Sequence, residues 1–268
     1  MKFVILALFV AGAYGCGLPT YPPVLSRVVG GDDVRAHSWP WQASLQYKGS
    51  TGSFHHTCGA TLISREWVMT AAHCISSRNT YKVFLGKHVL MDSNEAGAIG
   101  IEPAKIIVHE KWDSARIRND IALIKLPAPI TFTDTIMAAC LPDSGVVLAN
   151  NYPCYVTGWG RLSTGGPIAD ILQQALLPVV SYPNCSKPDW WGTLVTTDMV
   201  CAGGDGNLSS CNGDSGGPLN CRNADGSWDV HGVVSFGSSL GCNYPKKPSV
   251  FTRVSAYISW INNVMTTN

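Results

Sequence analysis

Short apolar runs, each closed by glycine, proline or polar residues, are the feature that most limits how this 268-residue chain can fold. Such runs suit strands, which take about four to eight residues, better than helices, which usually take about ten or more. With 27 glycines and 16 prolines set among the runs, the pattern predicts an all-β fold of the barrel or sandwich type. The first set of predicted strands is 41–47, 60–63, 67–70, 82–85, 105–109 and 121–125. The second set is 154–158, 173–180, 199–202, 218–221, 228–236 and 249–254.

Two other stretches organise the chain. The polar, turn-rich stretch 127–153 separates the two sets of strands and is the predicted boundary between two halves of the fold. The stretch 255–265 carries apolar residues at helical spacing behind Ser255, which predicts a C-terminal helix capped by that serine.

The first 15 residues read as a signal peptide. Lys2 supplies the positive end, residues 3–11 the apolar run, and residues 13–15 a small-x-small cleavage site. The run is shorter than the roughly 20 apolar residues that span a bilayer. We therefore expect a secreted, extracellular protein. A formal net charge of +1 gives no electrostatic reason to expect nucleic acid or a membrane surface as a partner.

In a secreted protein the ten cysteines are expected to form disulfides, and their even number favours complete pairing. Spacing alone leaves the connectivity open. A zinc site is the competing interpretation, but the Cys and His residues near Cys58 and His73 do not repeat a ligand pair at metal-binding spacing. We expect no metal and no cofactor.

The stretch 211–218, with sequence CNGDSGGP, suggests a nucleophile at Ser215. A serine hydroxyl needs a base that takes its proton, and the reaction needs N–H donors for the oxyanion. The backbone N–H groups of Gly213 and Ser215 could form that donor pair, because glycine permits the backbone angles required. A surface turn rich in Gly, Asp and Ser is the alternative interpretation.

Residues 16–27 form a short, proline-bearing segment that ends in Arg27 and precedes the apolar Val28. This pattern predicts a processing site and an activation peptide. Cleavage would create an ammonium on Val28, and Asp214 beside Ser215 is its expected partner. The alternative is that the segment is an ordinary linker.

Two further residues can complete the chemistry. His73 follows an apolar run and precedes Cys74, so a strand end and a disulfide would fix its ring as a general base requires. Asp120 stands directly before another apolar run and could hold the imidazole in the correct tautomer, although an isolated aspartate there is more often a turn residue. The remaining histidines receive no predicted role: His37, His55, His56, His88, His109 and His231.

These residues lie in motifs that together resemble the pancreatic chymotrypsin-like serine proteases. The motifs are TAAHC (70–74), NDIAL (119–123), GDSGGP (213–218), VVGG (28–31), VTGWG (156–160) and VSFG (234–237). His73, Asp120 and Ser215 occur in the chain order known for chymotrypsin. The start CGLP, the stretch NYPCY (151–155), WWG (190–192) and Asn212 look most like the elastase 2 and chymotrypsin C (caldecrin) branch.

The resemblance implies two six-stranded antiparallel β-barrels, at about 28–130 and 140–254, followed by the C-terminal helix, within one protease domain at 28–268. It implies His73, Asp120 and Ser215 as the catalytic residues and Gly213 and Ser215 as the oxyanion donors. It also implies five disulfides: Cys16–Cys140, Cys58–Cys74, Cys154–Cys221, Cys185–Cys201 and Cys211–Cys242. The expected product is a zymogen that trypsin activates at Arg27–Val28, and a monomer that meets protein substrates and protein protease inhibitors.

The resemblance places five residues around the pocket for the side chain before the cleaved bond: Ser209, Ser235, Phe236, Gly237 and Ser249. A neutral Ser209 at the pocket base argues against substrates with Arg or Lys, because a buried cation would be unpaired. Gly237 leaves the mouth open. We therefore expect cleavage after Leu, Met, Phe and Tyr, in dietary proteins or in other zymogens.

Three secondary positions carry weaker signals. Asn184 and Asn207 each begin an N-glycosylation sequon, and a glycan on Asn207 would crowd the pocket. Many relatives bind calcium in the loop that corresponds to 87–97. Lys87 stands where calcium binders carry a carboxylate, and a cation at a ligand position opposes a second cation, so we expect no calcium site.

Two competing functions remain. A catalytically inactive binding protein on a protease fold is one, although such proteins usually show a damaged Ser, His or Gly position, and none is damaged here. An α/β-hydrolase is the other, because residues 213–217 formally fit Gly-x-Ser-x-Gly. Its residue order would be Ser, acid, His, and the strand–helix alternation is missing, which argues against it.

Overall fold

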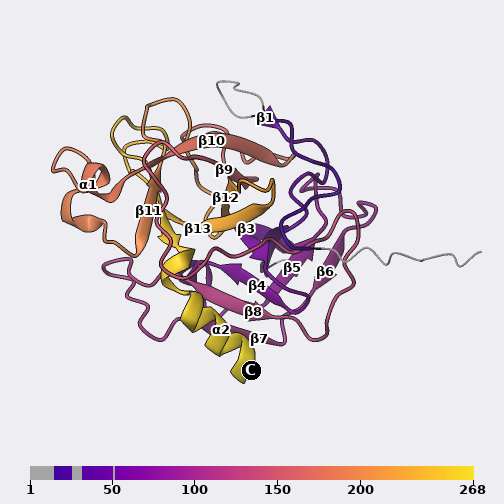
Figure 1. Ribbon diagram of the computed structural model, residues 1–268. Helices are drawn as coiled ribbons and strands as arrows, with labels where there is room; N and C mark the ends of the chain where they lie inside the picture. The colour runs from indigo at the N-terminus through magenta and orange to yellow at the C-terminus, as the bar shows by residue number, and fades with distance from the viewer. Residues whose placement is uncertain (1–14, 26–31, 51) are drawn as a thin grey trace, which may run out of the picture.

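Two antiparallel sheets lie side by side in the computed structural model, which describes residues 15–25, 32–50 and 52–268 (Figure 1). The first sheet is built from the N-terminal half of the chain and the second from the C-terminal half. The predicted signal peptide (apart from Gly15) and the predicted processing site at Arg27–Val28 lie outside the described residues.

The first sheet has seven strands in the order β6-β5-β2-β3-β4-β8-β7. Their bounds are β2 Gln42–Lys48, β3 Phe54–Leu62, β4 Trp67–Thr70, β5 Tyr81–Leu85, β6 Ile99–Ile101, β7 Lys105–Val108 and β8 Ala122–Lys125. Within the described part of the chain no ladder joins β6 to β7, so this sheet stays open where a closed six-stranded barrel was expected. Both edge strands are short, which leaves little backbone for a closing ladder.

The second sheet closes into a barrel. Its order is β1-β10-β11-β14-β13-β12-β9, and β10 pairs with β9 to complete six strands, with β1 outside them. The bounds are β1 Asp32–Asp33, β9 Pro153–Gly158, β10 Gln173–Val180, β11 Met199–Ala202, β12 Pro218–Arg222, β13 Trp228–Phe236 and β14 Ser249–Arg253. The all-β architecture with a closed second barrel is therefore confirmed. β1 pairs with β10, so this N-terminal strand belongs to the second barrel and not to the first sheet.

The strand predictions succeeded where side chains are buried and failed where they are not. β4, β10, β11 and β13 begin and end where the sequence predicts. The first half of β3 was missed because Phe54 to His56 is largely polar and only partly buried. β6 was missed because it is only three residues long, with a glycine at its centre and mainly exposed side chains.

The C-terminal helix α2 spans Ile258–Thr267 and crosses back to the first sheet (Figure 1). Ser255 was predicted as its cap, which is wrong. Ser255 lies in the short 3-10 helix η3 (Val254–Ala256), and its hydroxyl donates to the carbonyl oxygen of Val146 at 2.5 Å. Three other short helices were not predicted: η1 Ala72–Cys74, α1 Tyr182–Cys185 and η2 Gly192–Leu194.

Polar contacts fasten the two sheets together. The Trp41 indole N–H donates to Asn220 Oδ1 at 2.7 Å, and the Thr157 hydroxyl donates to Gln42 Oε1 at 2.7 Å. All four side chains are buried. Because buried polar groups are costly to leave unpaired, these bonds fix how the sheets sit against each other.

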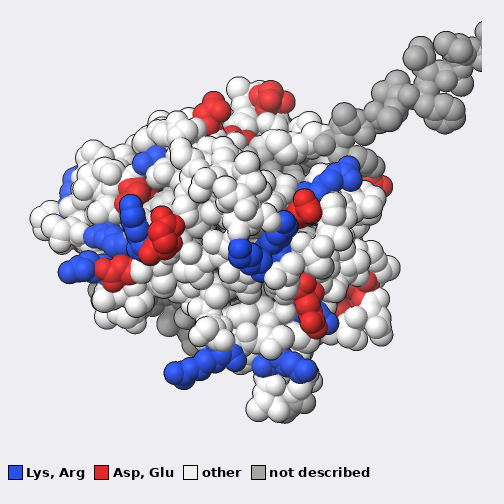
Figure 2. Space-filling model, turned by 90° about the horizontal axis from the view of Figure 1, so that it is seen from below, with Lys and Arg blue, Asp and Glu red and all other residues white. Residues whose placement is uncertain are grey.

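On the face shown in Figure 2, Lys and Arg are interspersed with Asp and Glu instead of forming one single-sign patch. Within the described ranges, no helix has both the length and the apolar character needed to cross a bilayer.

Candidate active site

His73 and Asp120 meet where the paired strands β4 and β8 of the first sheet end and begin. His73 lies in the 3-10 helix η1 (Ala72–Cys74), directly after β4, and the Cys58–Cys74 disulfide ties this turn to β3. The imidazole Nδ1 donates to Asp120 Oδ2 at 2.7 Å, and the backbone N–H of His73 donates to Oδ1 at 2.9 Å. These two bonds fix the ring so that Nε2 is free to accept a proton.

Asp120 receives a third donor from the second barrel. The Ser235 hydroxyl, on β13, donates to Asp120 Oδ2 at 2.5 Å. Asp120 is only 1% exposed, so its charge depends on these donors in place of water. Ser235 was predicted as a wall of the substrate pocket, and it also contacts the proposed catalytic carboxylate.

Ser215 lies where β3 and the second barrel come closest. The backbone N–H of Gly59 donates to the Ser215 carbonyl oxygen at 2.7 Å, and the N–H of Gly216 donates to the Val234 carbonyl oxygen at 2.8 Å. Gly216 has φ of +77°, and a Cβ there would lie 2.2 Å from the hydroxyl of Thr70. A side chain at this position would therefore push Ser215 away from the first sheet.

The hydroxyl of Ser215 does not bond His73 in this structure. Among the described residues, His73 Nε2 has one polar neighbour within hydrogen-bond distance, Cys74 Sγ at 3.8 Å, and this disulfide sulfur has no proton to donate to it. Such catalytic hydrogen bonds are often long in substrate-free enzymes and tighten when substrate binds. The structure thus joins His73 to Asp120 and leaves the expected bond from Ser215 unformed.

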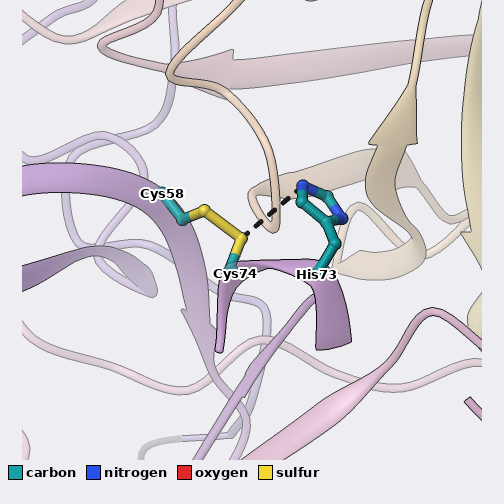
Figure 3. A group of neighbouring side chains, drawn as sticks. All are labelled: Cys58, His73 and Cys74. Carbon is teal, nitrogen blue, oxygen red and sulfur yellow. Dashed lines mark hydrogen bonds between the residues drawn. A yellow bond between two sulfur atoms is a disulfide. The ribbon is translucent and has the colours of Figure 1, made fainter. Parts of the chain in front are cut away.

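Cys58, His73 and Cys74 bring ligand atoms within 4.8 Å of one another, as a metal site would (Figure 3). The two sulfur atoms are bonded to each other in a disulfide. A metal requires thiolates, which this disulfide does not offer. The group is therefore a rigid support for the imidazole.

Two backbone N–H groups at the turn around Ser215, those of Gly213 and Ser215, were predicted as oxyanion donors. In the part of the chain that the structure describes, neither the N–H of Gly213 nor that of Ser215 donates to any acceptor, although both neighbouring amides, of Asp214 and Gly216, do. Gly213 has φ of +102°, a conformation that favours glycine.

His56 supports this turn, a role that the sequence did not suggest. Its Nε2 donates to the carbonyl oxygen of Gly213 at 3.0 Å, and its Nδ1 pairs with the Ser44 hydroxyl at 2.8 Å. Burial lowers the pKa of His56, against a smaller opposing effect of the Gly213 bond, so the ring is neutral at physiological pH. No sequence signal indicated it, because His56 lies in the polar, partly exposed first half of β3, outside the predicted strand.

Asp214 is half-buried and has no cation beside it among the described residues. Its Oδ1 accepts from the backbone N–H of Gly160 at 2.8 Å, and its Oδ2 accepts from that of Cys211 at 2.9 Å. No Lys, Arg or His among the described residues forms an ion pair with it. Burial raises the pKa of Asp214 to about 6 despite these two bonds.

A cavity of about 180 Å³ opens beside Asp214. It lies between β9, β10 and the loop before Ser215, and Gln174, Ser209 and Asn207 are among the residues that line it. Val28, the expected partner of Asp214, lies outside the described residues. The cavity provides a route from the surface to this carboxylate.

A second pocket, of about 290 Å³, adjoins Ser215. Ser235, Phe236 and Gly237 line it, and no lining residue is charged. Ser209 does not line this pocket and lines the cavity beside Asp214.

Ser210 lines this pocket in place of its neighbour Ser209. Ser249 is buried behind it and does not line the pocket as predicted. Its Oγ accepts from the backbone N–H of Ser210 at 2.9 Å and lies 2.9 Å from the Ser210 hydroxyl. Ser249 therefore supports the pocket through Ser210.

The loop 87–97 does not fit a calcium ion. The Lys87 ammonium is 3.3 Å from Glu95 Oε2 and also donates to the carbonyl oxygen of Asp92. Glu95 Oε1 accepts from the N–H of His88 at 2.8 Å. With a buried ammonium at the centre of the loop, the oxygen ligands that calcium needs are already engaged.

The five disulfides pair the ten cysteines as the resemblance implies: Cys16–Cys140, Cys58–Cys74, Cys154–Cys221, Cys185–Cys201 and Cys211–Cys242. The first of them ties the segment that starts at residue 16 to the body of the protein. Of the two sequon asparagines, Asn207 is exposed and Asn184 is half-buried in α1.

Comparisons with known proteins agree with this geometry. The sequence matches the family described as Trypsin over residues 28–261. Chymotrypsin-C of Bos taurus is 60% identical over 263 residues, 98% of this chain and 98% of that protein. Proproteinase E of Bos taurus is 55% identical over 248 residues (91% and 96%), and chymotrypsin-like elastase family member 1 of Rattus norvegicus 52% over 267 residues (99% and 98%). The resemblance drawn from the motifs is confirmed.

Proposed function

Because this chain belongs to the trypsin family of serine proteases, we propose that it is a secreted endopeptidase made as a zymogen and activated by cleavage at Arg27–Val28. The observation that carries the proposal is Asp214, a half-buried carboxylate whose pKa is raised by desolvation and which has a cavity beside it and no cationic partner among the described residues. An unpaired buried charge costs several kcal/mol, so this carboxylate favours any change that delivers a cation.

We assign the chemistry to three side chains. Ser215 Oγ attacks the carbonyl carbon of the peptide bond and gives its proton to His73 Nε2, while Asp120 orients and stabilises the imidazolium. The imidazolium then returns the proton to the leaving amine, and the acyl group stays on Ser215. Water repeats the sequence and releases the acid.

The N–H groups of Gly213 and Ser215 stabilise the oxyanion in this proposal. One such donor typically contributes about 2.7–4 kcal/mol to the transition state. Activation acts on the same turn, because docking of the Val28 ammonium against Asp214 would lock the residue that lies between the two donors. His56 supports that turn from the other side.

Activation is the direct test. Treatment of the purified chain with trypsin is expected to expose Val28 as a new N-terminus and to raise hydrolysis of a Leu peptide anilide from background by at least about 10²-fold, because the oxyanion donors are then fixed. N-terminal sequencing and initial rates on the same samples measure both events. Full turnover by the uncut chain, or cleavage at residue 27 without activity, would contradict the proposal. The second outcome would favour an inactive binding protein.

The uncharged pocket predicts the substrates. Peptide anilides with Leu, Met, Phe or Tyr before the cleaved bond are expected to react at least about tenfold faster than the Arg analogue, because one methylene in an apolar pocket is worth about 1–3 kcal/mol and a buried unpaired cation costs more. Values of kcat/KM for the series would measure this. Faster turnover of Arg than of Leu would be incompatible with the pocket as described.

The same proposal includes where the enzyme acts, what activates it and what it binds. We infer secretion from residues 1–15 and the five disulfides, which form in oxidising compartments. Trypsin is the proposed activator because the bond to be cut follows an arginine. The proposed partners are protein substrates and protein protease inhibitors, met by a monomer.

A further inference from the structure

A group of contacts from the second barrel holds the segment that carries Asp120. The Thr252 hydroxyl, on β14, donates to the backbone carbonyl oxygen of Asp120 at 2.7 Å. Thr252 is 4% exposed and Asp120 1% exposed, so water does not compete for this bond. The main chain of Asp120, the proposed orienting residue, is thus hydrogen-bonded to the second barrel.

Tyr257, which follows η3, places its hydroxyl beside the residue before Asp120. The hydroxyl lies 3.1 Å from Asn119 Oδ1 and 3.0 Å from Asp198 Oδ2, and its single proton is donated to one of these two oxygens at a time. Burial, and then the Asp198 carboxylate, raise the pKa of Tyr257, so the phenol keeps its proton and remains a donor. The other end of the Asn119 amide donates to the carbonyl oxygen of Lys111 at 2.8 Å.

The held segment has an unfavourable backbone. Asn119 has φ of +54° and Ile117 has φ of +52°, and positive φ is a strong outlier for a β-branched residue. Such conformations are strained and persist only when surrounding contacts determine them. Arg118, between the two, donates to the Thr196 hydroxyl at 2.7 Å and so adds a third contact to the second barrel.

We propose that Thr252 and Tyr257 are positioning residues for proteolysis: they set the depth at which the Asp120 carboxylate faces the His73 imidazole. The inference rests on the proposed function, in which Asp120 orients that ring. Asp120 must satisfy the Nδ1–H and the backbone N–H of His73 at once, at 2.7 and 2.9 Å. A small shift of the segment would weaken both bonds, and misplacement of a catalytic group by 1 Å can cost about 10²-fold in rate.

A purely structural role makes a different prediction. A hydrogen bond that only stabilises the fold would, when removed, lower the free energy of unfolding and leave the turnover of each folded molecule unchanged. A positioning bond lowers kcat of the folded enzyme and leaves KM unchanged, because Thr252 does not line the substrate pocket.

The test compares trypsin-activated Thr252→Val and Thr252→Ser with the wild type, with rates divided by the active-site concentration from a burst titration. We expect Thr252→Val to lower kcat on a Leu peptide amide roughly tenfold at constant KM. Thr252→Ser, which retains the hydroxyl, is expected to restore kcat to within about twofold of the wild type. Unchanged kcat in Thr252→Val would overturn the proposal.

Thr61→Val is the matched control. Thr61 is a fully buried strand threonine whose hydroxyl has no partner among the described residues, so its loss is expected to leave kcat unchanged. Should Thr252→Val fail to fold, Tyr257→Phe decides, with an expected loss in kcat of about threefold and unchanged kcat as the contrary result. An inactive wild type after cleavage would instead refute the proposed function.

Discussion

Replacement of Ser215 by alanine is expected to lower kcat/KM of the activated enzyme by about 10⁵- to 10⁶-fold, the loss typical when a serine protease loses its nucleophile. The Gly59 and Gly216 backbone bonds that seat residue 215 do not involve its side chain, so the fold is expected to persist. Initial rates on a Leu peptide anilide measure the effect. A residual rate over water is expected from the oxyanion donors and from substrate binding.

Ser144→Ala is a suitable control, because Ser144 is exposed in the loop between the two sheets. It is expected to retain wild-type activity. If Ser215→Ala kept more than about one hundredth of the activity, another group would be the nucleophile and the assignment of the triad would be refuted.

The Asp214→Asn variant is expected to gain stability as the uncut chain. Because burial raises the pKa of Asp214 to about 6 from 3.8, the folded wild type binds a proton more tightly than the unfolded chain does, and its stability falls as pH rises from about 4 to about 6. The shift corresponds to about 3 kcal/mol. Asparagine has no such charge but leaves one of two N–H donors without an acceptor, at a cost of about 1 kcal/mol.

The variant should therefore be slightly less stable than the wild type at pH 4 and more stable by about 1–2 kcal/mol at pH 8. Urea unfolding of both uncut chains at the two pH values measures the difference. Asp189→Asn, which removes an exposed carboxylate, is the control and should show no such crossover. Equal stability of Asp214→Asn and wild type at pH 8 would mean that the carboxylate already has a cationic partner in the uncut chain.

The same variant is expected to remain inactive after trypsin cuts it. A neutral amide cannot pair with the Val28 ammonium, and a buried unpaired ammonium is prohibitive, so the new terminus should stay outside the cavity. Without it the oxyanion donors are not fixed, and a loss of at least about 10²-fold is expected. N-terminal sequencing confirms the cut, and initial rates report activity. If the cut Asp214→Asn enzyme were active, activation would not require this carboxylate.

Much of the fold could be predicted from the sequence because buried strands require apolar residues, and these stand out in the sequence as short apolar runs. β4 and β13 consist mainly of buried residues bounded by turn residues, and the sequence predicts both of their ends. The open edge of the first sheet depends on ladder pairing between distant, partly exposed segments such as β6. The start of α2 depends on a tertiary contact, because Ser255 bonds Val146 instead of capping the helix.

The site shows the same division. The residues in strong motifs, such as His73 and Asp120, are brought together as predicted. Residues that act through a neighbour were misplaced or missed: Ser249 stands behind Ser210, and His56 reaches the carbonyl of Gly213. Their partners lie on other strands, so neither spacing nor composition near those residues could indicate them.

The buried lysine in the loop 87–97 has a consequence for how this protease depends on its surroundings. A metal ion has a dissociation constant, and a loop built on one loosens when the ion is diluted or chelated. The Lys87 ammonium is part of the chain and remains beside Glu95 at any concentration of divalent ions. The conformation of this loop is therefore expected to stay the same whether divalent ions are present or chelated.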